Sequence, residues 1–94
     1  MEKIKNNPLI NIGGVHILPK EDILGVFDLD ATTTKTDTKR FLQSREKMGR
    51  SVMVGNDLPK SFVLTVKGRK EVVYITTLST SAIQGRWKRQ SKHL

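Results

Sequence analysis

The sequence has few or none of several residue types, and each shortage excludes a class of chemistry. It contains no cysteine among its 94 residues, which excludes disulfides, thiolate nucleophiles, iron–sulfur clusters and ordinary structural zinc sites. Aromatic residues make up only 5% of the chain, which leaves few candidates for base-stacking platforms. No apolar run approaches the roughly 18 residues of a membrane span, and the N-terminus lacks a signal-peptide core. These absences predict a cytoplasmic protein that does not associate with membranes.

The length predicts one small domain with a thin core, because a chain of this size buries only about 60–65% of its unfolded surface. Its apolar share of 36% and charged share of 28% are sufficient for a folded domain and unlike those of a disordered tail. We expect a flexible N-terminus over residues 1–8, a folded domain over 9–86 and a basic C-terminal tail over 87–94.

Charge is distributed unevenly along the chain. Residues 1–34 carry three lysines and five acids, a net charge of −2, whereas residues 35–94 carry fourteen Lys/Arg and four acids, a net charge of +10. A basic surplus confined to part of a small domain favours a polyanionic partner, because Lys and Arg release condensed counterions when they meet phosphates. Nucleic acid is the favoured partner. A basic surface that only maintains solubility, and an anionic membrane or acidic protein as partner, remain alternatives.

The N-terminal third predicts short strands. Residues 9–12 and 15–18 form a hairpin around Gly13-Gly14, and Pro19 ends its second strand. Residues 23–29 are almost continuously apolar, which predicts a strand that is buried on both faces. Gly25 in its middle indicates a bulge or a close backbone approach.

One long helix is predicted over residues 34–48. Thr34 is placed to cap its N-terminus, and Gly49 is placed to end it in a left-handed conformation. Its apolar stripe is narrow and consists of Phe41, Leu42, the aliphatic stem of Arg45, and Met48.

The second half predicts three more strands, over residues 51–54, 61–66 and 71–76, with a basic turn at 67–70. Phe62, Leu64 and Val66 alternate toward one face of the middle strand. Ser79 is placed to cap a short helix from Thr80, which ends at Gly85 or continues into the tail. The predicted fold is α+β: a small, mostly antiparallel sheet of five or six strands, with one main helix and a short C-terminal helix.

Catalytic patterns are weak, and the sequence predicts no enzyme, no metal and no cofactor. His16 and His93 have no partners at metal-ligand spacing. Asp28 and Asp30 have a spacing that can hold Mg²⁺, but such pairs also cap turns. A hydroxyl cluster lacks a nearby base, so helix capping or phosphate contact is the better interpretation. The cluster consists of Thr76, Thr77, Ser79, Thr80 and Ser81.

Four segments occur in the order associated with one family. They are Leu9-Ile-Asn-Ile-Gly13, Ile23-Leu-Gly-Val-Phe27, Pro59-Lys-Ser-Phe-Val-Leu-Thr65 and Leu78-Ser-Thr-Ser81. The chain resembles the RemA/RemB extracellular-matrix regulators of Gram-positive bacteria over residues 9–86, and the RemB branch more closely. The resemblance implies a cytoplasmic, non-enzymatic regulator of biofilm-matrix genes. It also implies homo-oligomers, as rings in RemA members, which bind double-stranded DNA through arginines.

The positions that contact DNA in this family are altered here. The arginine that precedes the Ile-x-x-Val strand is replaced by Asp22, which follows Glu21, with Lys20 as the nearest base. The basic cluster before the next strand is reduced to Lys60. We therefore expect phosphate contacts to shift toward the main helix, the basic turn and the C-terminal tail. The predicted nucleic-acid-binding residues are Lys20, Lys60, Lys67, Arg69, Lys70, Arg86, Lys88 and Arg89.

Two other classes of function fit the same sequence. A self-associating or protein-binding module would use its charge only for solubility. A single-strand binder would use Trp87, Tyr74 or Phe27 as stacking platforms. No small-molecule substrate is evident from the motifs.

Overall fold

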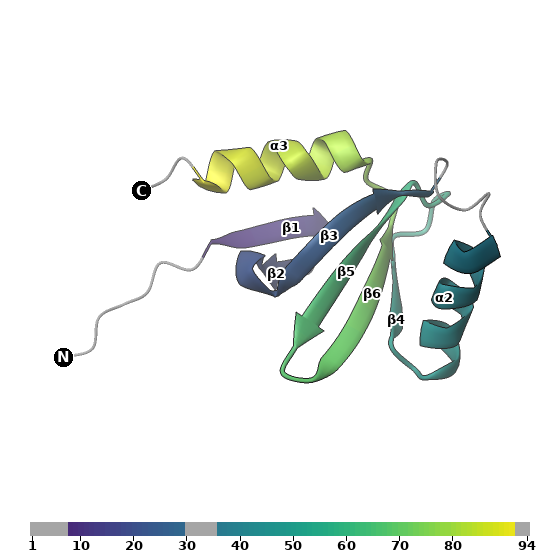
Figure 1. Ribbon diagram of the computed structural model, residues 1–94. Coiled ribbons are helices and arrows are strands. Elements are labelled where there is room, and N and C mark those ends of the chain that lie inside the picture. The colour runs from purple at the N-terminus through teal and green to yellow at the C-terminus, as the bar shows by residue number, and fades with distance from the viewer. Residues whose placement is uncertain (1–7, 30–35, 92–94) are drawn as a thin grey trace.

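The computed structural model describes residues 8–29 and 36–91, with the elements labelled in Figure 1. The described elements are β1 (Leu9–Gly13), β2 (His16–Pro19), the 3-10 turn η1 (Lys20–Asp22), β3 (Ile23–Asp28), α2 (Thr36–Lys47), β4 (Ser51–Val54), β5 (Ser61–Lys67), β6 (Lys70–Thr76) and α3 (Thr80–Ser91).

The described strands form two sheets, which corrects the prediction of a single sheet of five or six strands. The larger sheet has the order β3-β5-β6-β4, and β1 and β2 form a separate antiparallel hairpin. The mixture of helices and mostly antiparallel strands makes the fold α+β, as predicted. The only parallel pair among the described strands is β4 with β6. The hairpin stacks over the larger sheet, which buries the apolar face of the hairpin. If β1 and β2 extended the sheet sideways instead, that face would be exposed.

The core lies between the larger sheet, the β1–β2 hairpin and α3 (Figure 1). The hairpin contributes Ile10, Ile12 and Leu18, and α3 contributes Ile83, which is fully buried. From β5, Val63 is fully buried and belongs to this core cluster. The predicted stripe of Phe62, Leu64 and Val66 points to the other face of β5, where only Phe62 is buried.

Two contacts hold the end of the hairpin against the larger sheet. The hydroxyl of Thr76, which is fully buried, donates to the carbonyl of Ile12 at 2.6 Å and accepts the amide of Leu78 at 3.1 Å. Gly13 has a φ of 132°, and a Cβ there would lie 2.9 Å from a methyl carbon of Val54. Only glycine allows both this conformation and this close approach. The positive φ angles of Gly13 and Gly14, together with the antiparallel pairing of β1 and β2, confirm the predicted hairpin.

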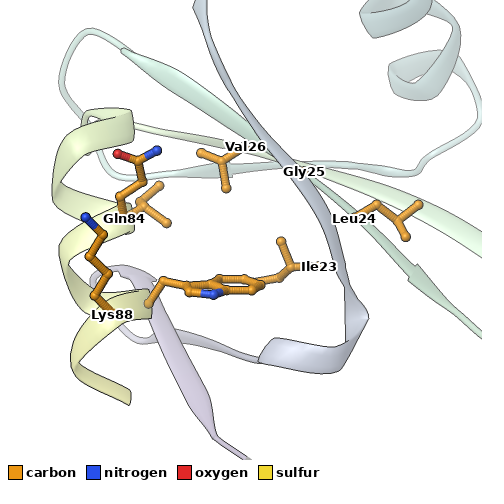
Figure 2. Close-up of a pocket in the computed structure, with 8 residues that line it drawn as sticks. Ile23, Leu24, Gly25, Val26, Gln84 and Lys88 are labelled. Carbon is orange, nitrogen blue, oxygen red and sulfur yellow. The ribbon is translucent and has the colours of Figure 1, made fainter. Parts of the chain in front are cut away.

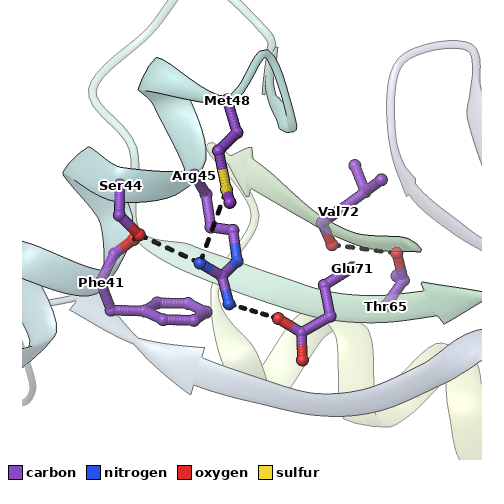
Figure 3. A network of polar contacts seen from close by, with 7 residues as sticks. All are labelled: Phe41, Ser44, Arg45, Met48, Thr65, Glu71 and Val72. Carbon is purple, nitrogen blue, oxygen red and sulfur yellow. Dashed lines mark hydrogen bonds and ion pairs between the residues drawn. The ribbon is translucent and has the colours of Figure 1, made fainter. Parts of the chain in front are cut away.

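The helix α2 covers the opposite side of the larger sheet, next to β4 and β6 (Figure 1). None of its residues is fully buried, and among the polar contacts in Figure 3 the one between Arg45 and Glu71 joins the helix to the sheet. The guanidinium of Arg45 forms an ion pair with Glu71 of β6 and lies 4.5 Å from the ring centroid of Phe41. Gly49, with a φ of 73°, follows the helix as predicted. The predicted cap at Thr34 lies outside the described residues.

The C-terminal helix is as long as α2, which corrects the prediction of a short one. Ser79 caps it as predicted, because its hydroxyl accepts the amide of Ala82 at 3.1 Å. The helix continues through Gly85 to Ser91. This continuation places Arg86 against β1 and Trp87 against the core, and these contacts offset the low helix propensity of glycine.

The strand β3 lies at an edge of the larger sheet, which corrects the prediction that it is buried on both faces. Ile23 is 9% exposed, whereas Leu24 is 61% and Phe27 39% exposed. Its apolar sequence therefore includes side chains that remain exposed to solvent. The pairing with β5 shifts register between Ile23 and Gly25, which confirms the irregularity expected at that glycine.

None of the helices in the described part of the chain is both long and apolar enough to cross a membrane.

Candidate nucleic-acid interface

The basic turn between β5 and β6 presents three of the predicted contact residues. Lys67 and Lys70 are opposite each other at the end of the ladder, and Arg69 lies in the turn between them. All three side chains are exposed. Like charges directly opposite each other on two strands destabilise a hairpin. The placement of Lys67 and Lys70 therefore lowers the stability of the fold and does not raise it.

A second basic cluster lies on α3, where Arg86 and Arg89 are three residues apart and so share one side of the helix. The guanidinium of Arg86 donates to both the carbonyl and the side-chain oxygen of Asn11, each at 2.9 Å. Sequence reasoning missed Asn11, because 75 positions separate it from Arg86 and no local pattern connects them. Asn11 fixes the position of a cation that would otherwise be mobile.

The hairpin β1–β2 lies between these two clusters. Ile17 of β2 lines a depression of about 350 Å³ together with Arg86 and Arg89. The same side chain lines a second depression of about 360 Å³, on whose other side lie Lys67 and Lys70. The two clusters therefore flank one strand of the hairpin, although they are far apart in sequence.

A further cation, Lys20, extends from η1, directly after β2. Its ammonium lies 4.6 Å from the centre of the Trp87 ring, close enough for a cation–π contact with α3. We define the basic face as the six residues that this arrangement gathers around the hairpin. They are Lys20, Lys67, Arg69, Lys70, Arg86 and Arg89.

Acidic residues affect the basic face at one place. Glu21 and Asp22 follow Lys20 within η1, and Asp22 lines the depression beside Lys67 and Lys70. Glu71 follows Lys70 directly but forms an ion pair with Arg45 of α2, which lies on the opposite side of the larger sheet. The basic face therefore has a local acidic interruption at η1, between the α3 cluster and the β5–β6 turn.

Two of the predicted residues lie apart from the basic face. Lys60 directly precedes β5, and Lys67 is the last residue of that strand, so about 20 Å of extended chain separates them. Lys88 is two residues from Arg86 on α3 and lines the cavity next to β3 instead. The exposed cations of α2 also lie away from the basic face, on the other side of the sheet, so the shift of phosphate contacts toward the main helix has no support in this arrangement.

The aromatic residues suggested as stacking platforms all have partners within the protein. The ring of Phe27 stacks on Phe62 with a centroid separation of 5.0 Å. Tyr74 and His16 make an edge contact at 6.3 Å, so His16 packs against a ring as well as lying on the hairpin. Trp87 packs against the core cluster. This packing is typical of structural aromatics and argues against single-strand stacking.

The hydroxyl cluster has structural roles at two of its members, since Thr76 holds β1 and Ser79 caps α3. Among residues 8–29 and 36–91, no group of three histidine or acidic residues is placed to hold a metal ion. Asp30, the second member of the suggested carboxylate pair, lies outside these ranges. The chain matches no protein-family model and no curated protein sequence.

Proposed function

We propose that this protein is a non-enzymatic DNA-binding regulator that acts as a homo-oligomer and contacts the phosphate backbone through the basic face. The observation that carries the proposal is the position of Arg86 and Arg89 on one side of β2 and of Lys67 and Lys70 on the other. Cations from separate elements converge on one strand, as expected for a surface that follows a polyphosphate.

The shape of the basic face favours backbone contact over base reading. A two-stranded hairpin with cations on both sides can lie along a duplex, while its outward side chains at Leu9 and Ile17 carry no hydrogen-bonding groups for base edges. Sequence preference would then come mainly from the bendability of the duplex. This reasoning agrees with the resemblance to the RemA/RemB regulators, from which we further propose a role in extracellular-matrix gene expression in the cytoplasm.

Oligomerisation would compensate for the small size of each basic face. Six cations per protomer give a weak site at physiological salt, but copies held together raise the effective concentration of the next site. The hairpin also exposes apolar side chains at Leu9, Val15 and Ile17, with Val15 88% exposed. Exposed apolar groups of this kind favour contact with another protein surface.

The test measures affinity for a duplex at several salt concentrations. A protomer that uses all six cations should show a slope of log K against log salt of about −5, and oligomers should show a steeper slope. Between about 50 and 200 mM salt, affinity should therefore fall roughly a thousandfold. Light scattering with and without duplex should show a mass of several protomers. An affinity that is constant over this range would refute phosphate contact.

A self-associating module that binds no DNA is the second candidate, and the same exposed apolar residues of the hairpin favour it. The two functions differ in one measurement. Replacement of Arg86 and Arg89 by Gln should weaken retention on duplex DNA under the first function, and should leave the solution mass unchanged. Under the second function, no duplex is retained by the unsubstituted protein at low salt.

A further inference from the structure

A groove of about 430 Å³ lies between β3 and α3, separate from the basic face (Figure 2). Ile23, Leu24, Gly25 and Val26 line it from the strand. Ile83, Gln84, Trp87 and Lys88 line it from the helix. In Figure 2 Val26 extends from the strand toward α3, Gln84 extends from the helix near it, and Lys88 lies along the near surface of the helix. The volume is in the range of sites that bind ligands.

The strand wall of this groove is a sheet edge that α3 covers only in part. In the described part of the chain β3 pairs with β5 on one side only, and its other edge faces α3 across the groove. Natural edge strands are usually protected by lysine, proline or a covering element. The stretch from Ile23 to Phe27 has no charge and no proline. An apolar edge of this kind offers backbone donors and acceptors to an added strand.

Gly25 brings the backbone itself to the surface of the groove. Gly25 lies between Leu24 and Val26 in the part of β3 that lines the groove, and it has no side chain. A Cβ at this position would lie 2.8 Å from the ring of Phe27, so the ring occupies the space on that side. That ring stacks on Phe62 of β5, so the space is filled on the face opposite Val26 and Gly25 gives no extra room in the groove.

The charge of the groove favours an acidic ligand. Lys88 is exposed and lines it, and Lys20 lies 4.6 Å from the ring of Trp87, which also lines it. None of the eight lining residues is acidic. Glu21 and Asp22 follow Lys20 in η1. Lys88 is therefore the charged group among the lining residues, while Ile23, Val26 and Ile83 make the remainder of the lining apolar.

We propose that this groove binds an extended, acidic peptide segment of a partner protein, which adds to β3 as a fifth strand of the larger sheet. Alternate side chains of the peptide pack on Val26 and Trp87, which are only partly buried, and a carboxylate meets Lys88 at the Trp87 end. The main-chain hydrogen bonds provide affinity, and the apolar contacts and the lysine provide specificity. The groove would serve as a protein-docking surface in addition to the DNA contacts proposed above.

Trp87 is the only tryptophan in the chain, so its fluorescence reports the occupancy of the groove directly. The probe is a synthetic hexapeptide of alternating valine and threonine that ends in aspartate, titrated into the 94-residue chain. We expect a saturable change in Trp87 emission. The same peptide ending in lysine should bind about tenfold more weakly, because it brings a positive charge toward Lys88. Equal binding of the two peptides would refute the assigned charge complementarity.

Backbone methylation separates strand addition from simple apolar binding. In an added strand, alternate residues direct their amides toward the sheet, so two hexapeptides methylated at odd or at even nitrogens should behave differently. We expect one pattern to lower affinity about a hundredfold, through the loss of three hydrogen bonds, and the other to bind nearly as well as the parent. Equal binding of both patterns would overturn strand addition.

A pair of substitutions on neighbouring residues locates the lysine contact. Lys88→Glu should weaken binding of the aspartate peptide about tenfold, since Lys88 lines the groove. Arg89→Glu is the matched control, because Arg89 lines the depression next to β1 instead and changes the net charge equally. Equal losses in the two variants would mean that only net charge matters, which would contradict the assigned position of the peptide.

A second copy of the chain is the competing occupant of the groove. Trp87 emission measured at increasing protein concentration, without peptide, distinguishes the two. A constant spectrum, together with peptide binding, supports the proposal, whereas a spectral change that tracks the solution mass and blocks the peptide would overturn it. The Lys67→Gln, Lys70→Gln variant should still bind the peptide, so failure of DNA binding and failure of peptide binding are separately visible.

Discussion

Replacement of Lys67 and Lys70 by Gln should weaken binding to duplex DNA without destabilising the fold. Both side chains are exposed, and both flank the depression next to β2. Near 0.1 M salt each phosphate contact contributes about 0.9 of a decade of affinity through counterion release, so two lost contacts should lower affinity roughly sixtyfold. The slope of log K against log salt should fall by about 2.

The fold should tolerate this change because the two lysines are opposite each other on neighbouring strands. Removing a pair of like charges from directly opposed positions relieves repulsion, so the urea midpoint of unfolding should stay constant or rise slightly. A loss of affinity that is accompanied by a lower midpoint would therefore indicate damage to the hairpin.

Fluorescence anisotropy of a labelled duplex of about 30 base pairs, long enough for several phosphate contacts per protomer, measures the affinity at each salt concentration. Lys39→Gln, Lys47→Gln is the matched control. Both residues are exposed on α2, on the opposite side of the larger sheet, and the net charge falls by the same amount. Equal weakening by the two double variants would show that overall charge governs binding, and would refute a localised basic face.

Three further predictions concern the fold, and each is measured by urea unfolding. Thr76→Val should lower the free energy of unfolding by about 2–4 kcal/mol, because it leaves the carbonyl of Ile12 and the amide of Leu78 without a partner. A loss no larger than that caused by the same substitution at an exposed threonine would contradict this role. Ser79→Ala should cost about 1 kcal/mol through loss of the helix cap, and Ser79→Asp should restore it. Ile83→Ala should cost about 2–5 kcal/mol, since the side chain is fully buried, and a loss below about 1 kcal/mol would place it outside the core.

The sequence predicted the basic turn and the basic helix residues as contact candidates, but not how they are arranged. Arg86 and Lys88 look equivalent in sequence, since both lie in one basic run. In the structure Arg86 bonds to Asn11 and Lys88 lines the β3–α3 groove, because the helix continues and separates them around its axis. The groove itself gave no signal in sequence, since its two walls are about 60 residues apart.

What the sequence determined by itself was local. The Gly13-Gly14 turn, the cap at Ser79 and the stop at Gly49 depend on backbone preferences of single residues, and the structure has each of them. Tertiary structure alone decided that the hairpin stacks as a separate sheet and that β3 lies at an edge. Those outcomes depend on which apolar faces bury one another across long separations, which no short stretch of sequence specifies.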